Sequence, residues 1–140
     1  MTRNTTNRGE PVQVENAISD RKHIARQFIE LVSTGKIDEA YRMYVALDGK
    51  HHNPFFPAGF PALRQAMKDN QVQFPDMRLT VKHVIGDGDL VAIHSQVVLH
   101  PGEVGMAVLH LFRFQDDRIV EMWDIGQHVP ADSPNQDGIF

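Results

Sequence analysis

The sequence predicts an α+β domain in which helices come first and an antiparallel sheet follows. Three observations predict it: apolar residues recur at helical spacing up to about residue 44, side chains alternate from about Arg78 onward, and a Gly-Asp-Gly-Asp turn at 86–89 separates two alternating segments. A chain of 140 residues suits one domain. We therefore expect a disordered arm over residues 1–15, a folded domain over 16–128 and a tail over 129–140.

Two apolar stripes predict a pair of antiparallel helices near the N-terminus. Ser19 would cap the first helix and Gly35 would end it. Residues 51–59 contain two prolines and a glycine, which predicts a loop, and Pro61 suits the first turn of a third helix. The first two stripes consist of Ile24, Phe28, Leu31 and Val32, and of Ile37, Ala40, Tyr41 and Tyr44.

The last two predicted strands, 104–114 and 119–127, determine which side chains meet on the sheet. If their turn has three residues, Phe114 pairs with Val120, and the same register places His110 opposite Asp124. Phe112 and Met122 then pair and form an apolar wall beside these two residues. A slip of one residue would put the ionisable side chains on opposite faces, which the apolar pattern argues against.

The strand before these, residues 90–100, extends the pattern. If Leu99 lies opposite Gly105, His94 falls opposite His110 and joins the same face. The other face of the sheet would expose large apolar side chains in a monomer, and such a patch usually marks an interface. We therefore expect a homodimer through an outer sheet face that carries Leu109, Leu111, Ile119 and Trp123.

The predicted pair of His110 and Asp124 suits acid–base chemistry. A buried carboxylate is costly unless it is paired, and a histidine beside it gives a site whose proton affinities can be tuned near neutrality. Such a pair can move protons at carbon or at a carbonyl. A polar pair that is satisfied in the core and does no chemistry fits the same residues equally well.

The loop that follows the second helix offers further candidates for substrate binding. His52 could point into the mouth of the pocket, with Asn53 and Phe55 beside it, whereas His51 and His23 are expected to face solvent. A metal site is an alternative, since His52, His94, His110 and Asp124 include enough ligands. No short ligand spacing such as His-x-x-x-His is present, so metal-free chemistry is preferred.

Composition narrows the classes of function. The net charge is −4, and Lys and Arg are spread along the chain, so neither nucleic acid nor an anionic membrane is expected as a partner. The chain has no cysteine, which removes disulfides and mildly favours a reducing compartment, so we expect a cytoplasmic protein. No dinucleotide or phosphate-binding fingerprint is present, so we expect a small-molecule substrate and no cofactor.

Three features of the chain carry a resemblance to a known family: its three helices, the loop His52-Asn53-Pro54 and a final strand at 118–124. In these features the chain resembles the SnoaL-like polyketide cyclases of the nuclear-transport-factor-2-like superfamily. Over about residues 16–140 the chain is most similar to a subgroup of predicted aldol-condensation enzymes. The resemblance implies a cone-like domain with a curved sheet, and a cofactor-free lyase or isomerase. Asp124 would be its acid/base and His110 its partner.

One departure from the family pattern concerns the final strand. Many relatives have a histidine two residues before the aspartate, where this chain has Met122. A role for a second polar group from that strand is therefore not expected. The superfamily also contains domains that bind a small ligand without catalysis, so this non-catalytic function is the alternative.

Overall fold

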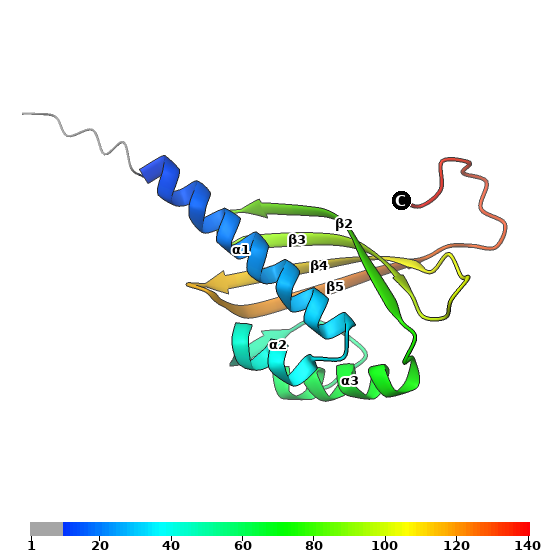
Figure 1. The fold of residues 1–140 in the computed structure, drawn as a ribbon, viewed down its shortest axis with the longest axis horizontal. Coiled ribbons are helices and arrows are strands. Elements are labelled where there is room, and N and C mark those ends of the chain that lie inside the picture. Colours follow the sequence, from blue (N-terminus) through cyan, green and yellow to red (C-terminus); the bar gives the residue numbers. More distant parts are fainter. Residues whose placement is uncertain (1–9) are drawn as a thin grey trace, which may run out of the picture.

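The computed structural model describes residues 10–140, which form three helices and one five-stranded sheet. Figure 1 shows α1 crossing one face of the sheet, with α2 and α3 together at one end. The α+β class is therefore confirmed. The elements in chain order are α1 (Glu10–Ser33), α2 (Ile37–Tyr44), β1 (Val45–His51), α3 (Phe60–Gln73), β2 (Arg78–Asp87), β3 (Leu90–Val98), β4 (Met106–Gln115) and β5 (Arg118–His128).

Helix α1 is longer than the sequence pattern indicated. It begins at Glu10, so residues 10–15 of the expected arm are helical, and Ser19 lies within the helix rather than at its N-cap. Residues 1–9 of that arm lie outside the described residues. The end of the helix is as predicted: Gly35 has a φ of +83°, and the Lys36 N–H donates to the Leu31 carbonyl at 2.9 Å. Of the helices between residues 10 and 140, none is long and apolar enough to span a membrane.

A strand that the sequence pattern did not reveal lies between α2 and α3. Strand β1 pairs in parallel with β5, with Val45 opposite Ile119 and His51 opposite Met122, and the sheet order is β1-β5-β4-β3-β2. The sheet is therefore mixed, and the expected order of three helices before a purely antiparallel sheet is wrong. Val45–His51 contains aspartate and glycine and lacks a clear alternation, so only its pairing partner defines it as a strand.

The predicted register of β4 and β5 is correct around His110 and Asp124 but wrong next to the turn. His110 pairs with Asp124, as expected, but Phe114 pairs with Ile119 instead of Val120. The turn has two residues rather than three, and a bulge after it restores the expected register. Because the bulge reverses the local alternation, Ile119 is fully buried in the core instead of lying on the outer face.

The expected register of β3 and β4 is wrong by one residue. Ile93, not His94, lies opposite His110, and His94 pairs with Leu109. A shift of one residue moves a strand's side chains to the opposite face, so His94 lies on the outer face of the sheet. Gly105 ends the connecting loop with a φ of +82°, where a Cβ would lie only 2.1 Å from the Val97 carbonyl oxygen.

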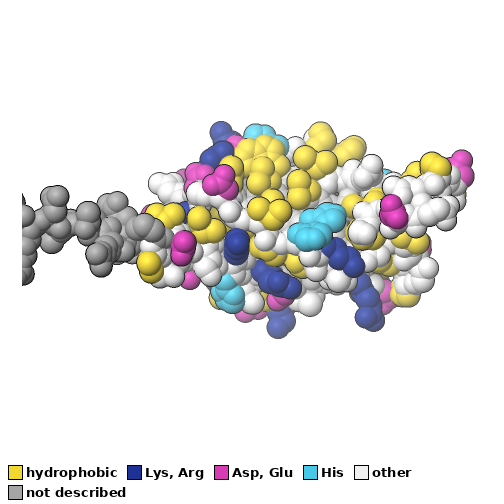
Figure 2. All heavy atoms as spheres, turned by 90° about the horizontal axis from the view of Figure 1, so that it is seen from above, with side chains coloured by type: hydrophobic (Ala, Val, Ile, Leu, Met, Phe, Trp, Pro, Cys, Tyr) yellow, Lys and Arg dark blue, Asp and Glu magenta, His cyan; other side chains and the backbone are white. Residues whose placement is uncertain are grey.

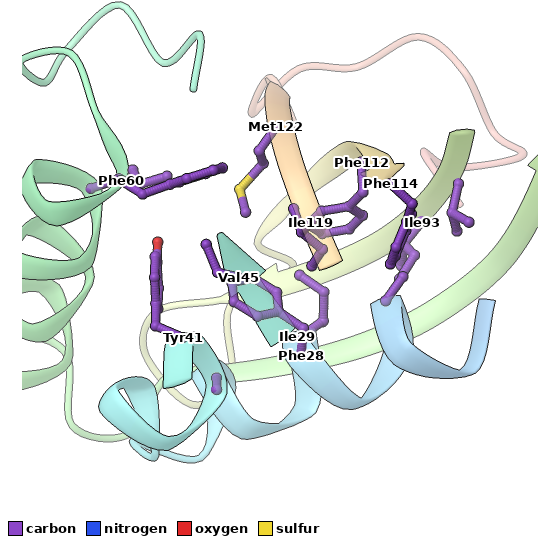
Figure 3. Packing of buried hydrophobic residues seen from close by; sticks show 14 of the residues in the cluster. Phe28, Ile29, Tyr41, Val45, Phe60, Ile93, Phe112, Phe114, Ile119 and Met122 are labelled. Carbon is purple, nitrogen blue, oxygen red and sulfur yellow. The ribbon is translucent and has the colours of Figure 1, made fainter. Parts of the chain in front are cut away.

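The core lies between the helices and the inner face of the sheet (Figure 3). Phe28 of α1 meets the ring of Phe112 edge to face, with centroids 5.7 Å apart, and meets Tyr41 at 5.4 Å. Tyr41 in turn meets Phe60 of α3 at 6.2 Å. These aromatic contacts tie all three helices to the central strands and fix one wall of the cavity described next.

Candidate functional site

A cavity of about 240 Å³ lies beside the core, between α1, α3 and the inner face of the sheet. Its walls are mostly apolar, and its ionisable side chains are those of His110 and Asp124. The sheet thus carries the reactive groups, while the helices supply most of the hydrocarbon surface. The lining residues are Ile29, Val32, Ser33, Asn53, Phe56, Leu63, Ala66, Met67, Asn70, Met77, Leu79, Val97, Val108, His110 and Asp124.

The carboxylate of Asp124 is held by a residue from another part of the chain. Asn53, just after β1, donates from Nδ2 to Asp124 Oδ2 at 2.9 Å. Its own Oδ1 accepts the Phe55 N–H at 2.9 Å, which fixes the orientation of the amide. Asn53 therefore presents a donor to the carboxylate and holds it in place.

His51 anchors the loop that carries Asn53. Its Nδ1 accepts the Asn53 N–H at 3.1 Å, so Nε2 carries the proton and donates to the Pro57 carbonyl at 2.7 Å. The side chain is buried, with 8% of the residue exposed, so the expectation that His51 faces solvent is wrong. Both ring nitrogens are used within the loop, and the residue positions Asn53.

We expect His51→Ala to lower the free energy of unfolding by about 1–3 kcal/mol, because it removes a buried side chain and both hydrogen bonds through which that side chain holds the loop. His52→Ala is the matched control, since the neighbouring ring is largely outside the core and 42% of its side chain is exposed. Urea denaturation of both variants measures the difference. Equal losses would show that His51 does not anchor the loop.

His110 is the partly buried histidine of the pair. Burial lowers the pKa of its imidazole below the usual range, and the charge of Asp124 opposes this shift. Nδ1 of His110 is buried and has no hydrogen-bond partner among the described residues. The ring lies nearly parallel to Phe112, with centroids 6.0 Å apart. The imidazole is therefore neutral near pH 7 and has unused hydrogen-bonding capacity.

The lowered pKa predicts a pH dependence of stability. Below about pH 6.5 the unfolded chain protonates this histidine while the folded chain does not, so the free energy of unfolding falls as pH falls. The loss is at most about 1.4 kcal/mol per pH unit for one group. His110→Gln should flatten the profile between pH 7 and 5, whereas His23→Gln, at an exposed position of α1, should leave it unchanged. An unaltered slope in His110→Gln would contradict the assignment.

Tyr41 lies near the site without lining the cavity. Its hydroxyl donates to Met67 Sδ at 3.3 Å. Burial raises the pKa of Tyr41, and the negative charge of Asp124 adds to the increase, while Arg64 opposes it. The phenol is therefore neutral and acts as a fixed support for the Met67 side of the cavity wall.

The structure brings together only part of the predicted site. Asn53 lines the cavity with His110 and Asp124. Phe112 and Met122 are buried in the core behind the cavity and do not line it. Phe55 is 85% exposed.

The two remaining histidines of the predicted site lie on the outer face. His52 stacks on Trp123, with centroids 5.0 Å apart, and its Nε2 meets Glu121 Oε2 at 2.6 Å. His94 meets His83, with their Nδ1 atoms 3.0 Å apart. The four residues of the alternative metal site therefore do not come together, because His52 and His94 lie on the opposite face of the sheet from the other two. Between residues 10 and 140, no three histidines or carboxylates come together as metal ligands.

Sequence reasoning missed the residues that form the cavity walls. Val32 belongs to the apolar stripe predicted for the first helix, and it lines the cavity together with Ile29, Leu63 and Met67, which the two stripes did not include. An apolar stripe marks a buried face but does not distinguish a packed core from a lined cavity. The buried position of His51 had no local signal, because it depends on the pairing of β1 with β5.

Comparison with known proteins agrees with this geometry. The family model of SnoaL-like polyketide cyclases matches residues 22–132. No curated protein matches the chain.

Solved structures share the fold. IdmH, a candidate polyketide cyclase from Streptomyces antibioticus, is 25% identical, with a TM-score of 0.61 over 76% of this chain and 91% of its own. A candidate polyketide cyclase from Acidithiobacillus ferrooxidans is 24% identical, with a TM-score of 0.62 over 76% and 87%. AclR from Streptomyces galilaeus, a candidate hydroxylase, is 21% identical, with a TM-score of 0.67 over 79% and 90%. Because the family model spans most of the folded chain, this protein belongs to the SnoaL-like polyketide cyclase family.

Proposed function

We propose that the protein is a cofactor-free enzyme that moves a proton next to a substrate carbonyl, in a reaction of the aldol-condensation or cyclase type. One observation carries the proposal: the Asp124 carboxylate, oriented by Asn53, lies beside the partly buried His110 in a mostly apolar cavity. A carboxylate in such surroundings can act as a base, and a neutral imidazole can donate to a developing oxyanion.

The proposed reaction has two proton transfers. Asp124 takes a proton from the carbon next to a carbonyl, the C–H electrons form the enolate, and His110 donates a hydrogen bond to its oxygen. The enolate carbon then forms a bond to a second carbonyl of the same substrate. The alkoxide formed at that carbonyl takes the proton back from Asp124, so no external oxidant or co-reactant is needed.

The test is exchange of the hydrogens next to a ketone with solvent deuterium, followed by NMR. Exchange needs only the first proton transfer and its reversal, so it reports on the base without the natural substrate. We expect exchange in a small ketone such as cyclohexanone to exceed that in buffer alone. Binding of the ketone without any acceleration of exchange would contradict the enzyme proposal and favour a non-catalytic ligand-binding domain.

We also propose that the outer sheet face forms a homodimer interface. Leu109 and Ile125 pair on this face and are 37% and 65% exposed. Leu111 and Trp123 also pair on this face, two residues further along the same two strands. Figure 2 shows exposed hydrophobic side chains gathered along one side of the molecule as seen from above. An apolar patch on a sheet face supports association with a second copy.

We expect Ile125→Asp to convert a dimer to a monomer in analytical ultracentrifugation, because it places a charge in the apolar centre of the contact. Val72→Asp is the control, since Val72 is 82% exposed on α3, away from this face. A wild-type protein that is monomeric at micromolar concentration would contradict the interface.

A further inference from the structure

Two buried polar atoms that have no hydrogen-bond partner among the described residues lie on the same face of the sheet. One is Nδ1 of His110 on β4, and the other is the hydroxyl oxygen of Ser95 on β3. Ser95 is completely buried. Buried polar atoms are normally paired, because an unpaired atom still carries the cost of losing its hydration. Each of these two atoms therefore calls for a partner.

The register of β3 and β4 makes the two residues diagonal neighbours. Ile93 pairs with His110 and Ser95 pairs with Val108, so Ser95 lies two residues from the position directly opposite His110. Residues two apart on a strand share a face, and Ile93 points into the core on that face (Figure 3). Diagonal neighbours across antiparallel strands have Cα atoms about 7–8 Å apart, a distance that an aromatic side chain can span.

The other sheet positions next to Ser95 all carry apolar side chains. They comprise its two pairing partners, its two neighbours on the same face of β3, and the diagonal positions on β2 and β4: Val81, Val108, Ile93, Val97, Leu79, Val84 and Met106. Among these described sheet positions, His110 is therefore the one polar neighbour of Ser95. A serine is poorly suited to such surroundings unless its hydroxyl has a partner.

The two ring nitrogens of His110 lie in different surroundings. The residue lines the cavity, whereas its Nδ1 is buried, so Nε2 is the nitrogen left to face a ligand. In the proposed reaction His110 donates a hydrogen bond to the enolate oxygen, which requires a proton on Nε2. A neutral imidazole carries one ring proton, so Nδ1 must then be an acceptor.

The hydroxyl of Ser95 can supply the donor that Nδ1 lacks. If the hydroxyl donates to Nδ1, its only hydrogen is used and the ring proton stays on Nε2. In the reverse arrangement Nδ1 donates to the hydroxyl oxygen, and the hydroxyl hydrogen then has no acceptor among the apolar side chains around it. The first arrangement leaves no buried donor unpaired. It requires another staggered rotamer of Ser95, or one water molecule between the two atoms.

We propose that Ser95 is a positioning residue that donates a hydrogen bond to Nδ1 of His110 and so keeps the ring proton on Nε2. The importance of this tautomer for a reaction rests on the proposed function, whereas the hydrogen bond rests on burial and strand register alone. Ser95 does not line the cavity, so it acts on a ligand only through His110.

The experiment is NMR of the full chain labelled with ¹⁵N-histidine at about pH 8, where an imidazole is neutral. His110→Gln identifies the His110 signals by their absence. We expect the wild-type protein to carry the ring proton on Nε2. Ser95→Ala should move the Nδ1 signal to higher frequency, as for a nitrogen that has lost a donor, or should place the ring proton on Nδ1. A wild-type proton on Nδ1, or an unchanged Nδ1 signal in Ser95→Ala, would overturn the proposal.

Three further variants separate the hydroxyl from changes in packing. Ser95→Thr keeps the hydroxyl and should retain the wild-type Nδ1 signal, whereas Ser95→Val has nearly the same shape and should behave like Ser95→Ala. Ser33→Ala removes another hydroxyl beside the cavity, one that donates to the Glu30 carbonyl at 3.0 Å, and should leave Nδ1 unchanged. Equal Nδ1 signals in folded Ser95→Thr and Ser95→Val would contradict a role for the hydroxyl.

Deuterium exchange of the ketone gives a separate readout of positioning. Ser95→Ala should lower the exchange rate at equal ketone occupancy by about tenfold, the lower end of the range for residues that orient a metal-bound histidine. The affinity for the ketone should not change. An exchange rate equal to that of the wild type would overturn the positioning role.

The two readouts distinguish this proposal from the proposed function. No exchange in the wild-type protein, together with the expected change of Nδ1 in Ser95→Ala, would contradict the enzyme and leave the hydrogen bond in place. Exchange in the wild-type protein with an unchanged Nδ1 signal in Ser95→Ala would contradict the role of Ser95 and leave the enzyme in place.

Discussion

Asp124→Asn is expected to reduce ketone deuterium exchange by about 10²–10⁴-fold, the usual contribution of a positioned general base. The amide has nearly the shape of the carboxylate, and its oxygen can still accept the hydrogen bond from Asn53 at the place where Oδ2 now lies, 2.9 Å away. It cannot take up a proton at neutral pH. The loss of exchange would therefore report the missing base at residue 124 rather than a change in geometry. It is measured as the ratio of the NMR exchange rates of the two proteins at equal ligand occupancy.

Two further variants make this expectation specific. Glu121→Gln removes a carboxylate from the same strand, but its partners are His52, Arg113 and Lys50, and it does not line the cavity. Exchange should be unchanged in this variant. Asn53→Ala should lower exchange by less than Asp124→Asn, because it removes the orienting donor and leaves the base. Full exchange activity in Asp124→Asn would remove Asp124 from the proposed reaction.

Phe112→Ala is expected to lower the free energy of unfolding by about 3–5 kcal/mol, a large part of the stability of a domain of this size. The side chain is fully buried and packs edge to face on Phe28, with centroids 5.7 Å apart. It also lies against His110. Deleting it removes the apolar contacts and leaves a cavity that the sheet and α1 cannot close.

The matched control is Phe55→Ala, because the same chemical change is made at a residue that is 85% exposed. Its unfolding free energy should change by no more than about 0.5 kcal/mol. Urea denaturation with a common m-value compares the two variants directly. Similar losses at both positions would contradict the described core.

The pairing of His110 with Asp124 was predictable although the turn beside it was not. The prediction used a three-residue turn, and the chain instead uses a two-residue turn followed by a bulge. In both arrangements Phe112 pairs with Met122, because the residue saved in the shorter turn is used in the bulge. The register from this pair to His110 and Asp124 is therefore the same. The apolar pattern of the two strands carries that register, whereas no local signal distinguishes the two turns.

The placement of His94 and His51 could not be predicted for different reasons. His94 depends on the length of the loop between β3 and β4, and a difference of one residue there moves it to the other face. His51 depends on β1, which pairs with β5 far along the chain: its partner Met122 lies 71 positions after it. The alternation of side chains within one strand reveals neither the length of a neighbouring loop nor a distant pairing partner, so it cannot predict these two placements.

The hydrogen bond between Asn53 and Asp124 joins residues 71 positions apart, and this distance has a consequence for folding. Strands β2 to β5 form a meander of neighbouring hairpins, whose contacts are local. Strand β1 occupies the sheet edge and meets β5 through a non-local parallel pairing, which carries a larger loop-closure cost. The orientation of the carboxylate is therefore completed only when this edge docks. A native molecule whose edge has transiently opened keeps the β2–β5 meander but lacks an assembled acid–base site.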